Sequence, residues 1–296
     1  MKKLLITLVL AFTVMQINAQ LLWKVSGKDC YKPSFLFGTI HLETGEYIDS
    51  VPGLNEAIES VDAIYGEIYS ENILDKAAMG KIMKDVVAPA DSTIDKLLTK
   101  EEYNIVDSVV RAYMMGIIGL ENLKMLKPAV VYEHLYVMQM QKYFPKAQDL
   151  ANSLDMAIQN RGIQLGKHVD GLESVDDQIK ALFGTPLTKQ AQDLVDFCRK
   201  DNTIEQYGKQ LCDAYHAQDI AAIERIIFDP EMGMSEEEME TISYKRNRNW
   251  MEKIEMTLPV QSVLIAVGAA HLLGPEGLIQ LLRDRGYTVE PVKDFH

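Results

Sequence analysis

Two short motifs, Gly38-Thr39-Ile40-His41 and Gly268-Ala269-Ala270-His271, repeat one pattern near opposite ends of the sequence. Each follows a run of apolar, β-prone residues and places a histidine three residues after a glycine. A buried strand that ends at a glycine and then presents a polar side chain is typical of α/β proteins, which place their chemistry at the carboxyl edge of a sheet. The pair of motifs therefore predicts that both histidines belong to one site.

The remaining pattern predicts a mixed α/β fold, with a central mixed β-sheet flanked by many helices and the two Gly-x-x-His motifs at strand ends. Apolar runs bounded by turn residues predict strands over 21–25, 34–37, 62–68, 168–173, 262–267 and 287–292. The first two of these strands are expected to form a hairpin. Helical periodicity dominates elsewhere. The last two strands enclose a helix, which predicts that they pair in parallel.

The first 19 residues have the pattern of a secretory signal peptide. Two lysines precede an apolar run over 4–15, and a cleavage site ends at Ala19. The run is too short to span a bilayer. We therefore expect an exported protein, periplasmic or extracellular, with no stable membrane span once residues 1–19 are removed. Residues 20–296 are expected to form a single domain with a helical insertion around 72–145.

Composition excludes some classes of partner. The sequence has 30 Lys and Arg against 43 Asp and Glu, and its formal net charge is −13. An acidic chain repels phosphate backbones, so nucleic acid is not an expected partner. With 47% hydrophobic residues, the chain can build a full core, which argues against disorder.

Three cysteines, Cys30, Cys198 and Cys212, follow the signal segment. An oxidising compartment would allow one pair and leave one thiol over. Cys198 and Cys212 could pair only if their helices fold back on each other. Three buried thiols are an equally acceptable interpretation.

Two acidic residues follow predicted strands and are candidates to join the histidines. Glu67 comes directly after a glycine within an apolar run, where a carboxylate is costly to bury unless it is paired, protonated or bound to a metal. Glu173 lies at a strand-to-helix junction. It either faces the same crevice as His41 or interacts only with the dipole of the following helix.

Two imidazoles and a carboxylate form a common ligand set for a divalent metal ion. Such an ion activates water and polarises a carbonyl, so hydrolysis needs no protein nucleophile. The sequence contains neither Gly-x-Ser-x-Gly nor His-Glu-x-x-His, so serine hydrolases and ordinary zincins lose their main support. Spacing alone favours structural histidines. The repeated context after two strands is what favours a site.

The sequence also resembles the TraB/GumN family, which includes the Tiki metalloproteases, over nearly all of the chain after the signal segment. The segments that carry the resemblance are Phe35-Leu36-Phe37-Gly38-Thr39-Ile40-His41, the run from Val267 through Gly277, its continuation from Leu281 to Val289, Gly171-Leu172-Glu173 with Gln178, and Arg246-Asn247 with Trp250. The resemblance implies a mixed α/β fold whose strands end in the two Gly-x-x-His motifs. For Tiki-like members it also implies a peptidase activity that depends on a divalent metal ion.

For Tiki-like members the resemblance also implies that the two histidines and a glutamate are essential, and the matching residues here are His41, His271 and Glu67. The segment Tyr65-Gly66-Glu67-Ile68-Tyr69 differs from the family pattern, because no second acidic residue follows Glu67.

The ligand set and the resemblance together lead us to expect an exported metal-dependent hydrolase, a peptidase acting on peptides or proteins. The expected ligands suit manganese, cobalt or zinc equally.

The expected catalytic residues are Glu67, Glu173 and Arg246. Glu67 completes the metal ligand set or acts as the general base, and Glu173 is a second candidate for the base. Arg246 either steadies a substrate carboxylate or oxyanion or forms a structural ion pair with an inner carboxylate. The alternatives are a non-catalytic protein of the same fold that binds a metal, haem or a partner, and a metal-free esterase with a histidine base.

Overall fold

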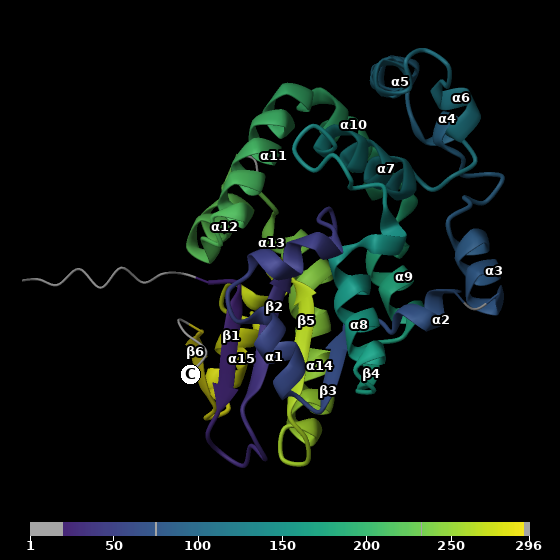
Figure 1. Ribbon diagram of the computed structural model, residues 1–296. Helices are drawn as coiled ribbons and strands as arrows, with labels where there is room; N and C mark the ends of the chain where they lie inside the picture. Colours follow the sequence, from purple (N-terminus) through teal and green to yellow (C-terminus); the bar gives the residue numbers. More distant parts are fainter. Residues whose placement is uncertain (1–19, 75, 232, 293–296) are drawn as a thin grey trace, which may run out of the picture.

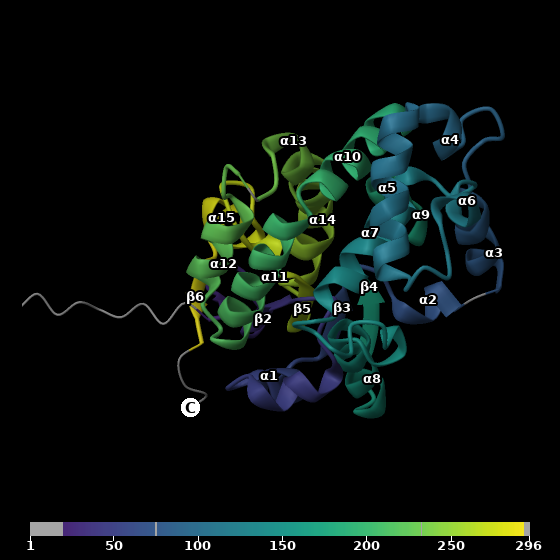
Figure 2. The ribbon, with the colours of Figure 1, turned by 90° about the horizontal axis from the view of Figure 1, so that it is seen from above.

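The computed structural model describes residues 20–74, 76–231 and 233–292, and the described chain has the mixed α/β fold expected from the sequence (Figure 1). A six-stranded sheet in the order β4-β3-β5-β2-β1-β6 forms its centre. Helices α1 and α8 lie on one side of the sheet, and α14 and α15 lie on the other (Figure 2). The predicted signal peptide lies outside the described residues.

Four parallel strands form the part of the sheet that carries both motifs. They are β2 (Ser34–Thr39), β3 (Ala63–Gly66), β4 (His168–Gly171) and β5 (Val263–Gly268). β5 pairs with β2 on one side and with β3 on the other, and β4 pairs with β3. Thr39 lies opposite Gly268 at the end of the β2–β5 ladder. The two Gly-x-x-His motifs therefore leave the sheet at the same edge and at the same level.

The other two strands complete the sheet on one side. β1 (Leu22–Ser26) pairs antiparallel with β2, as the expected hairpin requires, and β6 (Thr288–Pro291) pairs antiparallel with β1. The predicted parallel pairing of the last two strands is wrong. Both sides of β5 are already occupied by β2 and β3, so the chain passes through α15 (Leu278–Asp284) and joins the sheet at its free edge.

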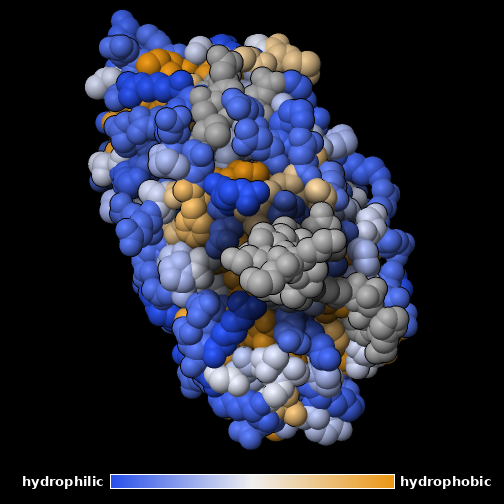
Figure 3. All heavy atoms as spheres, turned by 90° about the vertical axis from the view of Figure 1, so that its left-hand side faces the viewer, coloured by the Kyte–Doolittle hydropathy of each residue, from blue (hydrophilic) through white to orange (hydrophobic). Residues whose placement is uncertain are grey.

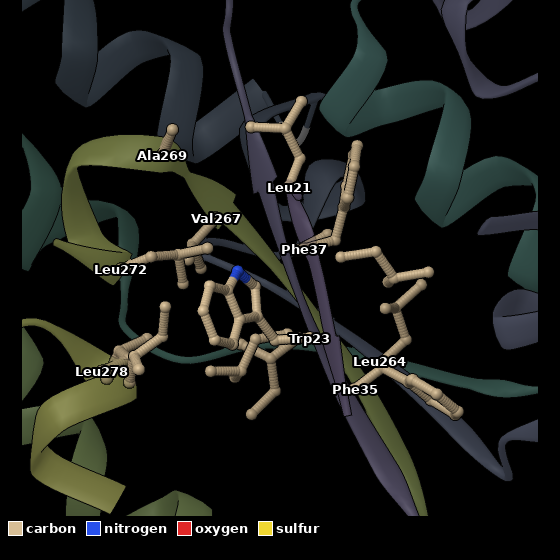
Figure 4. Packing of buried hydrophobic residues seen from close by; sticks show 14 of the residues in the cluster. Leu21, Trp23, Phe35, Phe37, Leu264, Val267, Ala269, Leu272 and Leu278 are labelled. Atoms are coloured by element: carbon tan, nitrogen blue, oxygen red, sulfur yellow. The ribbon is translucent and has the colours of Figure 1, made fainter. Parts of the chain in front are cut away.

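Apolar side chains cover both faces of the sheet. Figure 4 shows Trp23, Val267, Leu272 and Leu278 on one face and Phe35, Phe37 and Leu264 on the other. All six residues of β2 are buried. Full burial of a large apolar side chain stabilises a fold by about 1.5–3 kcal/mol. The strands that carry the histidines are therefore among the most firmly held elements of the molecule.

Helices fill the connections between the strands. Before β4 they are η1 (Gly45–Ser50), α1 (Leu54–Ser60), α2 (Ser70–Leu74), α3 (Lys76–Asp85), α4 (Ile94–Leu97), α5 (Lys100–Tyr113), α6 (Leu120–Leu123), α7 (Pro128–Met140), η2 (Leu150–Asn152) and α8 (Leu154–Gln164). After β4 they are α9 (Val175–Phe183), α10 (Leu187–Arg199), α11 (Asp201–His216), α12 (Ile220–Ile227), α13 (Glu236–Met239), the π-helical turn η3 (Glu240–Tyr244), α14 (Lys245–Thr257) and η4 (Ala269–Leu272), followed by α15.

Local sequence sets several helix starts. The Thr99 side chain accepts the backbone N–H of Glu102, whose carboxylate accepts the N–H of Thr99 in return, and this capping box begins α5. Ser174 and Asp177 begin α9 in the same way. Pro128 occupies the first turn of α7, where its missing N–H costs nothing.

The predicted helical insertion around 72–145 contains α2 to α7. Part of it packs with α10 into a hydrophobic cluster that is separate from the sheet core. Buried members of this second cluster include Ile94, Val106, Val110, Leu120, Val131, Leu135 and Leu194. Tyr136 packs against both clusters and so lies where they meet.

Three further observations concern the surface, the helices and the cysteines of the described chain. Hydrophilic residues cover most of the face in Figure 3, and hydrophobic ones form small separate groups among them. Within the described ranges, every helix is too short or too polar to cross a membrane. Cys30, Cys198 and Cys212 are present as thiols, so no disulfide joins Cys198 to Cys212 in this structure.

Candidate active site

The ends of β2 and β5 bring two imidazoles to one carboxylate oxygen. Nε2 of His41 and Nε2 of His271 each lie 3.6 Å from Oε1 of Glu67. Glu67 directly follows β3, the neighbour of β5. Residues from three strand ends that are far apart in the sequence therefore meet at one point above the sheet edge.

His271 is buried, with 3% of its surface exposed, and is held in one tautomer. Asn247 donates from Nδ2 to the backbone carbonyls of His271 and Glu276, so its Oδ1 accepts the proton of His271 Nδ1 at 2.7 Å. Nε2 of His271 therefore carries the lone pair, and it accepts a hydrogen bond from Nη1 of Arg246 at 3.0 Å. Burial is the main cause that lowers the pKa of His271 to about 3, so the ring is neutral near pH 7.

His41 has the opposite surroundings, because its side chain is 61% exposed. Its Nδ1 lies 2.9 Å from Oδ2 of Asp155, and the other oxygen of Asp155 accepts a hydrogen bond from the hydroxyl of Thr39 at 2.6 Å. The carboxylate of Asp155 is the main cause that raises the pKa of His41 to about 10. The same contact turns Nε2 toward Glu67, as a second-layer carboxylate does for many metal-binding histidines.

Glu67 is an ionised carboxylate despite being only 6% exposed. Its Oε1 accepts the backbone N–H of Gly268 at 2.9 Å, and its Oε2 accepts hydrogen bonds from Arg246 at 2.6 Å and Gln178 at 3.1 Å. Burial by itself would raise the pKa of Glu67. The two imidazoles, the guanidinium and the Gly268 N–H outweigh burial and hold that pKa well below its usual range.

Arg246 is the buried cation beside this carboxylate. It lies in the first turn of α14, directly after the π-helical turn η3, a type of distortion that is frequent at functional sites. Its Nη2 lies 2.6 Å from an oxygen of Glu67 and 2.6 Å from an oxygen of Glu173. Trp250 donates its indole N–H to Glu173 at 3.0 Å and stacks on His271 with the ring centroids 4.4 Å apart. Burial raises the pKa of Glu173, and the hydrogen bonds from Arg246 oppose that rise.

Gly268 leaves space beside Oε1 of Glu67 and the two imidazole rings. A Cβ at this position would lie 3.3 Å from Oε1 of Glu67, 3.5 Å from Nε2 of His41 and 3.8 Å from Cδ2 of His271. The missing side chain therefore leaves room next to the donor atoms of the cluster.

The donor atoms suit a divalent ion in their chemistry, although they are not arranged around one. Among the residues that the structure describes, no group of three or more His, Cys, Asp or Glu side chains has metal-binding geometry. Two ligands of a tetrahedral zinc ion are separated by about 3.4 Å, because each bond is about 2.1 Å long. The separation of 3.6 Å between Glu67 and each histidine is close to that value. To bind an ion, His271 would have to give up its hydrogen bond from Arg246.

The structure brings together all the residues that the sequence placed in the site. They are His41, Glu67, Glu173, Arg246 and His271. Sequence reasoning missed Asp155 as the partner of His41. It lies in the first turn of α8, where an acidic residue is expected simply as a dipole partner, so no local signal points to the histidine. Asn247 entered only through the family resemblance, and its hydrogen bond to His271 was not expected.

Comparison with known proteins agrees with this arrangement. The model of the TraB/PrgY/gumN family matches residues 21–291. The chain belongs to the TraB/PrgY/gumN family. The protein "Metalloprotease TIKI2" of Danio rerio is 21% identical over 319 aligned residues, which cover 91% of this chain and 60% of that protein. The chain thus spans about three fifths of the length of this relative. No solved structure matches.

The TraB/PrgY/gumN match includes both Gly-x-x-His motifs, Glu67, Glu173 and Arg246. The family membership expected from those motifs is confirmed.

Proposed function

We propose that this member of the TraB/PrgY/gumN family is a divalent-metal-dependent hydrolase that cleaves peptide bonds. The observation that carries the proposal is the approach of two imidazole Nε2 atoms to one carboxylate oxygen, each at 3.6 Å. The similarity to a protein named as a metalloprotease favours peptides over other substrates. We extend the proposal to export through residues 1–19, so the mature protein should begin at Gln20 when its N-terminus is sequenced.

In this proposal His41, His271 and Glu67 hold the ion. A bound divalent ion supplies an activated water molecule and polarises the scissile carbonyl. Asp155 orients His41 through Nδ1, and Asn247 keeps the proton of His271 on Nδ1, so both Nε2 atoms are directed to the cluster. His41, whose pKa is raised to about 10, would have to release its Nε2 proton when the ion binds.

Glu67 is better placed as a ligand than as a general base. Its Oε2 already accepts two hydrogen bonds, and its Oε1 faces both imidazoles. Glu173 is likewise engaged, because Arg246 and Trp250 bind both of its oxygens. These contacts favour Glu173 as the residue that positions Arg246. Once released from His271, Nη1 of Arg246 would be free to stabilise negative charge on the oxygen of a substrate carbonyl.

A second candidate is a metal-free role in which the histidines only brace the strand ends. One observation favours it, because Arg246 already satisfies the lone pair of His271 Nε2. Under this alternative, titration of the wild-type protein with Mn²⁺, Co²⁺ or Zn²⁺ would release no heat of binding.

The decisive experiment compares wild type with His41→Ala and His271→Ala. Metal content after incubation with each ion and removal of excess should be near one ion per wild-type chain and near zero in both variants. Cleavage of a peptide library by the same samples should require the ion and stop on addition of chelator. Stoichiometric binding that survives both substitutions, or cleavage that resists chelator, would sink the proposal.

A further inference from the structure

A cavity of about 310 Å³ lies where the two hydrophobic clusters meet. It is lined by residues of α7, α9, α10, α11 and the α13–η3 segment. The residues that matter for the argument are Tyr132, Glu133, Tyr136, Phe197, Tyr207 and Ile242. Figure 1 shows α7, α10 and α11 gathered beyond the end of the sheet where β5 terminates. Junctions between two packed units are common places for ligands.

Two observations connect this cavity to the candidate active site. The backbone carbonyl of Ile242, which lines the cavity, accepts a hydrogen bond from Nη1 of Arg246 at 2.8 Å. Burial raises the pKa of Glu133 and the charge of His41 opposes that rise, so the two side chains are within electrostatic range of each other. The cavity wall therefore adjoins Arg246, which in turn contacts His271 and Glu67.

Polar groups in the cavity wall are available to a ligand. Within the described part of the chain, the hydroxyls of Tyr132, Tyr136 and Tyr207 and the carboxylate of Glu133 take part in no hydrogen bond or ion pair. Solvent reaches Glu133, yet burial by the surrounding protein raises its pKa. Both properties fit a carboxylate on the wall of a hollow. Tyr132 packs on Phe197 with the ring centroids 4.7 Å apart, so two aromatic rings form part of the cavity wall.

The charges around the cavity favour a cation. Four carboxylates line it, those of Glu133, Asp193, Glu237 and Glu238, against the two amino groups of Lys189 and Lys200. Lys189 already forms an ion pair with Asp193. Aromatic faces attract cations. A side chain with an aliphatic stem and a positively charged end, such as lysine or arginine, suits a cavity that has apolar walls and one carboxylate.

We propose that this cavity binds a cationic group of a peptide substrate, an amine or guanidinium, and thereby places a neighbouring peptide bond beside His41 and His271. The inference rests on the proposed function, whose substrate class it specifies. The cation is supplied by a lysine or arginine side chain or by the amino terminus of the peptide. Glu133 pairs with the cation, and the tyrosines surround its stem.

Binding can be measured without turnover, by calorimetric titration of the full mature protein in chelator. Three probes separate the sources of the cation: a blocked alanine pentapeptide with a central lysine, the same peptide with norleucine, and the norleucine peptide with a free amino end. At least one cationic probe should bind about tenfold more tightly than the blocked norleucine peptide. Whichever cationic probe does so identifies the source.

Two variants and one control assign that preference to the cavity. Glu133→Gln should bring the cationic and neutral probes within about twofold of each other, and Tyr136→Phe should weaken binding of the cationic probe by a smaller factor. The control is Glu252→Gln, which alters an exposed carboxylate on α14 and should keep the full preference.

The outcomes separate this inference from the proposed function. Equal binding of all probes by wild type, or a full preference retained by Glu133→Gln, overturns the cavity proposal. A cation preference that Glu133→Gln removes supports it, even if addition of metal then produces no cleavage. That last result would contradict only the peptidase proposal.

Discussion

The two Gly-x-x-His motifs end in histidines with opposite surroundings. His271, after β5, is buried against Trp250, hydrogen-bonded to an amide and next to a guanidinium, and its pKa is lowered to about 3. His41, after β2, is exposed and paired with a carboxylate, and its pKa is raised to about 10. Both rings nevertheless direct Nε2 to the same oxygen of Glu67.

The difference shows that the Gly-x-x-His motif and the side chains packed around it determine different properties of each histidine. The glycine and the strand end place each imidazole, whereas side chains from α8 and α14 decide its charge. The pair therefore combines a neutral ring that is fixed in one tautomer with a ring that solvent can reach and protonate. Four predictions test this contrast.

Arg246→Met should have the largest effect, because it removes the cation that helps to keep His271 neutral. It also leaves the buried carboxylates of Glu67 and Glu173 without their counter-ion, at a cost of about 3–5 kcal/mol in the free energy of unfolding. The control is Arg248→Met, in the same helix, whose ion pairs with Glu240 and Glu276 lie at the surface and contribute about 1 kcal/mol or less. Urea denaturation measures both. Equal losses in the two variants would contradict the contrast.

His271→Ala and His41→Ala should differ in stability while sharing their effect on metal binding. Loss of the buried ring leaves a cavity and strips Oδ1 of Asn247 of its hydrogen bond, at a cost of about 2–4 kcal/mol. Loss of the exposed ring removes its ion pair with Asp155, which solvent screens, so it should cost less, about 1 kcal/mol. Each variant should nevertheless weaken metal binding by at least about a hundredfold, since each removes one proposed ligand. A comparison of thermal unfolding with metal titration checks both statements.

The two histidines should make stability depend on pH in opposite directions in metal-free protein. The unfolded chain takes up a proton near pH 6.5 that folded His271 refuses until about pH 3, so stability falls as pH drops through this window. The loss attributable to His271 should be about 2 kcal/mol between about pH 6.5 and about pH 5. Folded His41 keeps its proton up to about pH 10, so its contribution is complete below pH 6.5 and is lost as pH rises toward 10.

Unfolding free energies of wild type, His271→Ala and His41→Ala across this range separate the two contributions. The loss of stability on the acid side should shrink only in His271→Ala, and the loss on the alkaline side only in His41→Ala. A single histidine accounting for both sides would be incompatible with the two environments.

Gly268→Ala should have the smallest effect on stability. The backbone at Gly268 has φ −50°, which alanine adopts without strain, so the change in unfolding free energy should stay within about 1 kcal/mol. The added methyl group would nevertheless enter the space between the two histidines and Glu67. Metal affinity should therefore fall about tenfold or more, measured by calorimetry, with Gly80→Ala, a position with open space around its Cβ, as the control.

Features encoded within a few neighbouring residues could be predicted from the sequence. The strand ends, the capping boxes of α5 and α9 and the meeting of the two motifs with Glu67 all follow from local patterns and from the rule that parallel strands end at one edge. The partner of His41 could not be predicted, because Asp155 has the same local signature as any acid in a first helical turn. The position of β6 was wrong because a βαβ pattern does not reveal which strand edge is still free.

The parallel contact between β2 and β5 joins segments from the two ends of the chain. During synthesis the N-terminal strand leaves the ribosome long before its neighbour, so a nascent chain holds one half of the cluster without the other. The cluster of His41, Glu67 and His271 can therefore assemble only after translation has passed residue 271, so a shorter nascent chain lacks the complete cluster.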